Sequence, residues 1–149
     1  MDDIREIELL QRTFALYNDR CEWERLANLF EEQGCLIRPS DPNHPIQGRH
    51  AILQSFLARA TGLRRRHFVA DTQVRLLDDN NAHAYCHSIL IEEVSEGCGK
   101  ISVGGFNDIL RRASEGWRFI SRSGFVKINP TPFSEPTEPG LSAVTALFV

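Results

Sequence analysis

The segment RRRHFVADTQVRLL, residues 64–77, marks the change from helical to strand patterns along the chain. Its second half alternates apolar and polar side chains, which indicates a β-strand that is entered from a basic turn. The residues before it have mostly helical spacing, and the residues after it have mostly strand patterns. We therefore expect an α+β chain in which helices come first and a long strand meander follows.

Two helices are expected near the start of the chain. Apolar residues recur at three- and four-residue spacing over residues 3–18, which marks one face of a helix. Asp2 or Asp3 can cap its start. The pattern pauses and then resumes at Trp23, and Gly34 is the expected C-cap of this second helix.

A mixed segment connects the second helix to a third one. Residues 35–38 are a short apolar run, which predicts one strand, and residues 39–45 hold three prolines, which predicts a loop. Residues 46–48 could add a very short strand. Helical spacing returns over residues 49–62, so three helices are expected ahead of the long strands.

Long strands are predicted for the rest of the domain. They cover about residues 67–77, 82–94, 100–112 and 117–128. The turns between them are short enough for antiparallel neighbours. Prolines accumulate from residue 129, so we expect one domain over residues 1–128 and an irregular tail over residues 129–149 with an apolar end.

Composition excludes several classes of protein. The chain has 149 residues, enough for one ordinary domain, and its net charge of −3 gives no general attraction to nucleic acid. No apolar run reaches the roughly 20 residues of a membrane span. The four cysteines form no Cys-x-x-Cys pair, so free thiols are expected and no metal site. We expect a cytoplasmic protein that binds neither nucleic acid nor membrane.

His67 is the histidine that we most expect to be functional, because it lies at the start of the first long strand. Regular alternation would place it on the polar face, opposite Phe68 and Val74. A bulge near Ala70 or Asp71 would shift the alternation and turn His67 toward the interior. A functional His67 therefore requires that bulge.

The order of elements resembles the nuclear-transport-factor-2-like (NTF2-like), or SnoaL-like, superfamily. The resemblance covers about residues 3–128 and rests on four short matches: WERLANLF at 23–30, Gly-Arg at 48–49, GFND at 105–108 and GWRF at 116–119. It implies a cone of curved, mostly antiparallel sheet and about three helices that encloses a pocket. It also implies a homodimer or a higher homo-oligomer.

Within that superfamily the chain is most similar to scytalone dehydratase. Asp19 stands four residues before Trp23, where that family has an acid, and His67-Phe68-Val69 matches the opening of its first long strand. The resemblance implies that Asp19 and His67 form a hydrogen-bonded pair. It also implies that the histidine shuttles the proton during elimination of water beside a ketone.

The chain departs from that pattern at other active-site positions. Two family tyrosines, a second histidine, a serine and an asparagine fall at or near Asn18, Arg38, Glu92, Gly104 and Phe106. A one-residue shift would bring in Asn107 in place of Phe106. Besides the catalytic candidates, we expect the substrate pocket to include Tyr17, Phe68, Phe106 and Asn107.

The predicted chemistry follows from these residue types. Elimination of water next to a carbonyl needs a base for the acidified proton and an acid for the leaving hydroxyl, and one histidine can serve as both in turn. We therefore expect a small lyase that needs no cofactor, takes a small apolar or aromatic molecule and dehydrates a cyclic hydroxy-ketone through Asp19 and His67. Two alternatives stay open: a non-catalytic binding or structural subunit, similar to the small subunit of ring-hydroxylating dioxygenases, and a ketosteroid-isomerase-like proton transfer.

Overall fold

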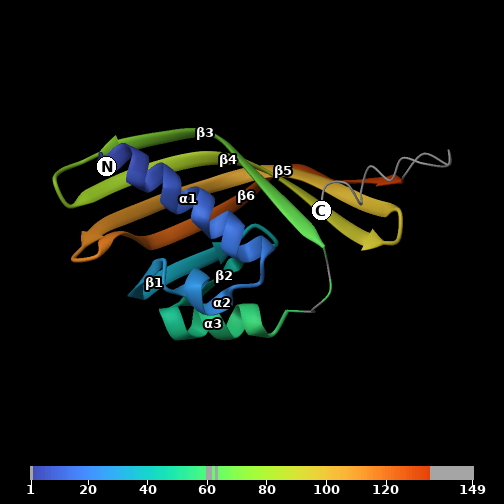
Figure 1. Cartoon of the computed structure of the whole chain (residues 1–149), viewed down its shortest axis with the longest axis horizontal. Helices are drawn as coiled ribbons and strands as arrows, with labels where there is room; N and C mark the ends of the chain where they lie inside the picture. Colours follow the sequence, from blue (N-terminus) through green and yellow to red (C-terminus); the bar gives the residue numbers. More distant parts are fainter. Residues whose placement is uncertain (1, 60–61, 63, 135–149) are drawn as a thin grey trace.

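The computed structural model describes residues 2–59, 62 and 64–134. The described residues form three helices and one six-stranded sheet (Figure 1). The helices are α1 (Asp3–Asp19), α2 (Trp23–Ala27) and α3 (Arg49–Leu57). The strands are β1 (Phe30–Arg38), β2 (Asp41–Gln47), β3 (Arg65–Leu76), β4 (Asn81–Ser95), β5 (Cys98–Ala113) and β6 (Gly116–Ser134).

The sheet is curved and mostly antiparallel, as the sequence predicted. Its strand order is β2-β1-β6-β5-β4-β3, and only the β1–β6 pair is parallel. The strands from β3 to β6 form the expected meander, α1 crosses one face of the sheet, and α2 and α3 lie together near β1 (Figure 1). In the part of the chain that the structure describes, no helix has the length and apolarity needed to cross a membrane.

The second helix is shorter than expected, and the strand after it starts earlier. α2 ends at Ala27 and β1 begins at Phe30, so Gly34 lies inside a strand and the predicted C-cap is wrong. Phe30 pairs with Phe119 of β6 in this region. A Cβ atom on Gly34 would come within 3.0 Å of the carbonyl oxygen of Phe119, so the glycine permits a close approach of two backbones.

The proline-rich segment between β1 and α3 is a strand and not the predicted loop. β2 pairs with β1 alone and forms one edge of the sheet. Pro42 and Pro45 lie within β2. An edge strand tolerates proline because the N–H groups on its open side need no partner in the sheet.

The last strand also extends beyond its predicted end. β6 continues to Ser134, so the expectation of an irregular segment is wrong for residues 129–134. β1 pairs with β6 only as far as Ser123, and the remainder of β6 pairs with β5 alone. One side of this part of β6 is therefore an edge, where prolines are tolerated. Residues 135–149 lie outside the described part of the chain.

Apolar side chains from the helices and the sheet meet in one core. The residues of this cluster are Ile7, Leu10, Phe14, Leu26, Phe30, Leu36, Ile52, Phe56, Ala82, Ala84, Leu110, Trp117 and Phe119. Each of the three helices contributes at least one of them. Burial of such side chains is the main favourable contribution to folding.

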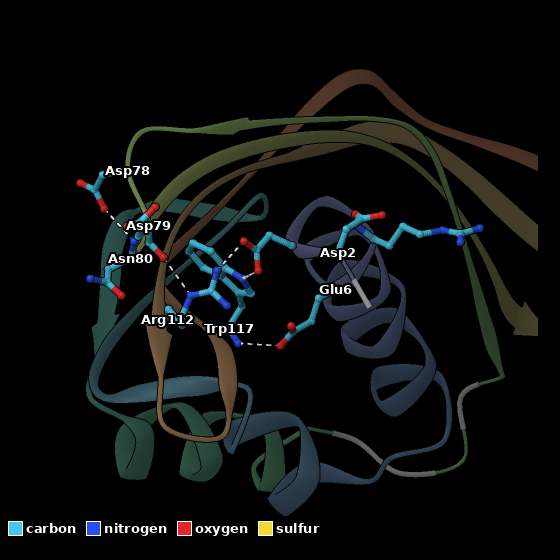
Figure 2. A network of polar contacts seen from close by, with 9 residues as sticks. Asp2, Glu6, Asp78, Asp79, Asn80, Arg112 and Trp117 are labelled. Atoms are coloured by element: carbon cyan, nitrogen blue, oxygen red, sulfur yellow. Dashed lines mark hydrogen bonds and ion pairs between the residues drawn. The ribbon is translucent and has the colours of Figure 1, made fainter.

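The start of α1 is tied to the hairpin of β5 and β6 (Figure 2). Asp2 caps the helix, Asp3 accepts a hydrogen bond from the indole N–H of Trp117 at 3.1 Å, and Glu6 accepts one from the backbone N–H of Trp117 at 3.0 Å. Asp3 also pairs with Arg112. The contacts with Arg112 and Trp117 lower the pKa of Asp3. These contacts fix where α1 crosses the sheet.

A fully buried ion pair joins β5 and β6. A guanidinium nitrogen of Arg122 lies 2.8 Å from a carboxylate oxygen of Asp108, and both side chains have 0% exposure. Gln11 of α1 donates a hydrogen bond to the same carboxylate at 2.8 Å. Burial raises the pKa of Asp108, and the charge of Arg122 opposes that shift.

Aromatic rings enclose the buried guanidinium. The carbon atom of the Arg122 guanidinium lies 3.9–4.7 Å from three ring centroids, those of Phe106, Phe14 and Phe119. Cations are attracted to the faces of such rings. The positive charge in the core is thus held by one carboxylate and an aromatic cage.

Replacement of Arg122 by Met should lower the free energy of unfolding by about 3–5 kcal/mol, because it leaves Asp108 buried without its partner. Urea denaturation measures this change. Arg111→Met is the matched control: its ion pair with Glu31 is exposed, and its loss should cost about 0–1 kcal/mol. Asp108→Leu combined with Arg122→Met should recover much of the loss. Unchanged stability of the single variant would contradict the assignment.

Candidate functional site

Strand β3 contains a bulge opposite β4. Ala70 pairs with His87 and Gln73 pairs with Tyr85, so three steps along β3 match two steps along β4. Asp71 lies at the bulge with a φ of +50°, a conformation that aspartate adopts more readily than most residues. The bulge expected near Ala70 or Asp71 is confirmed.

The bulge puts His67 on the interior face of the sheet. Val74, beyond the bulge, packs against the core, and the His67 side chain, before the bulge, is only 11% exposed. Phe68 faces the other way and is 45% exposed. In a regular strand without the bulge, His67 would face outward and Phe68 would face the core.

Asp19, the last residue of α1, holds His67 by two contacts. One carboxylate oxygen accepts a hydrogen bond from the backbone N–H of His67 at 2.8 Å. The other lies 2.5 Å from Nδ1 of the imidazole ring. The Asp19 side chain is 4% exposed. The ring is therefore fixed on its Nδ1 side, which leaves Nε2 as the nitrogen available for a ligand.

His67 lines a cavity between the helices and the sheet. The cavity has a volume of about 630 Å³, within the roughly 300–1,000 Å³ that is typical of small-molecule sites. Its wall is formed by residues of α1, β1, α3 and β3–β6. Arg59, just after α3, and Pro39 and Ser40, just after β1, also contribute. The lining residues are Phe14, Asn18, Leu36, Arg38, Pro39, Ser40, Phe56, Arg59, Arg65, His67, Ser88, Leu90, Glu92, Lys100, Ser102, Val103, Gly104, Gly105, Phe106, Phe125 and Val126.

Two other His–Asp contacts lie at the surface. His44 Nδ1 is 2.6 Å from Asp41, and His87 Nδ1 is 3.2 Å from Asp71. The aspartates of these contacts are 55% and 74% exposed, and none of the four residues lines the cavity. Burial and position thus distinguish the pair at the cavity, because only an enclosed pair acts on a ligand away from water.

Of the other four residues expected in the pocket, one lies there. Phe106 lines the cavity, but Tyr17, Phe68 and Asn107 do not. Tyr17 packs against the core cluster from α1, and Phe68 lies on the outer face of the sheet. Asn107 follows Phe106 on the same strand and is exposed, because successive strand residues point to opposite faces. The predictions for these three residues are wrong.

The positions at which the chain departs from the scytalone dehydratase pattern all line the cavity. They are Asn18, Arg38, Glu92, Gly104 and Phe106. The sequence contained this signal, because these residues were already matched to active-site positions. Arg59, Arg65 and Lys100 also line the cavity and had no such signal.

Two arginines flank one aromatic ring of the cavity wall. Arg38 donates to the carbonyl oxygen of Ser55 at 2.7 Å and to its hydroxyl at 2.8 Å. Arg59 donates to the side-chain oxygen of Asn18 at 3.2 Å. Their guanidinium carbons lie 5.2 and 4.3 Å from the ring centroid of Phe56. These contacts give each guanidinium group a defined position at the cavity.

The basic residues of the cavity perturb one another. Burial, together with the charges of Arg38 and Arg65, lowers the pKa of Arg59 to about 10, and the charge of Glu92 opposes this shift. Burial also lowers the pKa of Arg38. Glu92 itself pairs with Lys100 at 3.4 Å. The cavity therefore holds positive charges at a cost in electrostatic free energy.

No metal site is evident among residues 2–59, 62 and 64–134: no three His, Cys, Asp or Glu side chains are grouped to hold an ion. All four cysteines are free. Only Cys86 is fully buried; Cys35 and Cys98 are partly buried, and Cys21 is exposed.

Comparison with known proteins identifies the family. The pattern of the SnoaL-like domain matches residues 1–123. The chain belongs to the SnoaL-like family. The SnoaL-like or NTF2-like fold covers dehydratases, isomerases and non-catalytic members, so membership of the family leaves the activity open. No curated protein matches this SnoaL-like chain.

Solved structures from bacteria share the fold. A protein provisionally assigned as a scytalone dehydratase, from Novosphingobium aromaticivorans, has a TM-score of 0.77 at 20% identity over 92% of this chain and 94% of its own. A protein of unknown function from Mycobacterium tuberculosis has a TM-score of 0.75 at 25% identity over 83% and 71% of the two chains. An NTF2-like protein from N. aromaticivorans has 0.68 at 24% identity over 99% and 89%.

Replacement of Asp71 by Val should cost about 1–2 kcal/mol of stability, because a β-branched residue does not readily adopt the positive φ of the bulge. Asp71→Gly should be tolerated better, because glycine adopts this conformation without strain. Chemical denaturation of both variants tests the difference. Equal stability of the two would contradict a strained bulge.

Replacement of Arg59 by Met should raise the free energy of unfolding of the ligand-free protein by roughly 1–3 kcal/mol. The unfolded chain holds the Arg59 proton up to the ordinary, much higher pKa of an arginine, whereas the folded chain releases it at about 10. The cost of the charge is therefore fully present below pH 10 and declines as the pH rises above it. Chemical denaturation at pH 7 measures whether the free energy of unfolding rises, and a large loss of stability would contradict the prediction.

Proposed function

We propose that this SnoaL-like protein is a small lyase that eliminates water from a cyclic hydroxy-ketone by general acid–base catalysis. One observation carries the proposal: His67 lines the cavity while its Nδ1 lies 2.5 Å from the buried carboxylate of Asp19. This is the arrangement by which a carboxylate prepares a histidine for proton transfer.

Each step of the elimination has an assigned group. Nε2 of His67 takes the proton from the carbon next to the substrate carbonyl, and an enolate forms. The C–O bond then breaks, the same proton passes from Nε2 to the departing hydroxyl, and a carbon–carbon double bond and one water molecule result. His67 returns to its neutral form, so the cycle needs no other reactant.

Asp19 orients the histidine and stabilises its charged form. Its contact with Nδ1 favours the tautomer that carries the proton on Nδ1, which leaves Nε2 free to act as a base. Its contact with the backbone N–H of His67 fixes the carboxylate, so the ring is held ready before a substrate binds.

The alternatives have less support. A ketosteroid-isomerase-like reaction needs a carboxylate as the base, and among the lining residues that the structure describes the only acidic one is Glu92, which pairs with Lys100. A purely structural subunit has no need of a buried carboxylate behind a cavity histidine, since burial of a carboxylate is costly. The geometry therefore favours an enzyme.

Variants of the pair test the mechanism. His67→Gln and Asp19→Asn should each lower the turnover of a cyclic hydroxy-ketone by about 10²–10⁴-fold, because one removes the base and the other disturbs its tautomer. Ultraviolet absorption of the conjugated ketone follows the product. His44→Gln is the matched control, because it removes a His–Asp contact of similar length at the surface.

The outcomes separate clearly. The control variant should retain wild-type turnover, and circular dichroism should show that all three variants are folded. If a hydroxy-ketone is dehydrated and both His67→Gln and Asp19→Asn process it at the wild-type rate, the proposed mechanism is wrong.

A further inference from the structure

We propose that the cavity selects a ligand with an ionised acidic group, a carboxylate held by Arg38 and Arg59. The substrate is then a cyclic hydroxy-ketone that carries a carboxylate. This statement about the substrate rests on the proposed function. Selection of the anion itself is a binding property and can be tested without turnover.

The residues that line the cavity carry a net positive charge, although the net charge of the whole protein is negative. Four described lining residues are basic, Arg38, Arg59, Arg65 and Lys100, and one is acidic, Glu92. The whole chain carries a net charge of −3. A concave site with apolar walls concentrates the field of such charges and attracts ions of the opposite sign.

The two arginines contact neutral groups. Arg38 bonds to Ser55 and Arg59 bonds to Asn18, and in the described part of the chain neither forms an ion pair with a carboxylate. Arg122 shows the contrast, since its charge is balanced by Asp108 in the core. The charges of Arg38 and Arg59 therefore remain available to a ligand.

Part of the guanidinium group of Arg38 lacks a partner. Its Nε is buried and forms no hydrogen bond, whereas its Nη2 is occupied by Ser55. Guanidinium groups offer donors in a planar fork that matches the two oxygens of a carboxylate. A bound carboxylate would supply acceptors for unused donors on both arginines and would reduce the repulsion between them.

The position of Arg59 puts the anion near the reactive histidine. Arg59 bonds to Asn18, which adjoins Asp19, the residue that holds His67. Phe56 lies under both arginines and also lines the cavity, so it supplies an apolar wall for the ring of the same ligand. One molecule can thus present its carboxylate to the arginines and its ring to the apolar wall.

A different role for the arginines would be stabilisation of the enolate alone. In that case they would improve the reaction of neutral and acidic substrates alike. Binding in the ground state separates the two roles, because only a carboxylate site prefers an acid to its uncharged amide.

The test compares three ring acids with their amides: benzoate, 2-naphthoate and cyclohexanecarboxylate against the corresponding carboxamides. Calorimetric titration of the full chain at pH 8 measures the dissociation constants. Wild-type protein should bind at least one acid about tenfold or more tightly than its amide, as expected for charge-assisted hydrogen bonds. Arg38→Met and Arg59→Met should each weaken the binding of that acid by about 10–100-fold and leave the affinity for the amide unchanged.

Two controls keep the outcome interpretable. Arg75→Met removes an exposed positive charge from the same sheet without touching the cavity, and it should leave both affinities unchanged. His67→Gln should retain the preference for the acid while it loses turnover, so failure of the catalytic proposal would not remove the binding result. No preference for any acid over its amide, or equal losses for acid and amide in both arginine variants, would overturn the inference.

Discussion

The double contact between Asp19 and His67 is the constraint on which the site depends. It joins the last residue of α1 to the first part of β3, an edge strand of the sheet. One carboxylate oxygen binds the backbone and the other binds the ring, so the position of the strand and the orientation of the imidazole are set together. A carboxylate that is 4% exposed is costly to bury, and these two hydrogen bonds offset that cost.

The protein uses arginine in two opposite ways. Arg122 is buried in the core, where Asp108 balances its charge and three aromatic rings surround it. Arg38 and Arg59 stand at the cavity and bind neutral oxygen atoms. Phe14 and Phe106 belong to both environments, since they surround Arg122 and also line the cavity. The charge in the core serves the fold, whereas the charges of the cavity are open to a ligand.

Local patterns predicted most elements and failed where tertiary contacts decide. The helix over residues 3–18 and the four long strands follow from apolar periodicity, which reports burial directly. The segments 39–45 and 129–134 were expected to be irregular because they contain prolines, yet both contain strand residues. Whether a proline is tolerated depends on whether its strand lies at an edge, and the edge is a property of the assembled sheet.

The kinds of chemistry and the order of the elements could be read from the residues alone. The sequence shows a histidine at the start of a strand, an acid at the end of a helix, and the family resemblance that links them. The contact between Asp19 and His67, which are 48 positions apart, became visible only in the folded chain, where they meet at hydrogen-bonding distance. The same holds for the extra residue at Asp71 that turns His67 inward, because the register of two strands is fixed by their pairing and not by either strand alone.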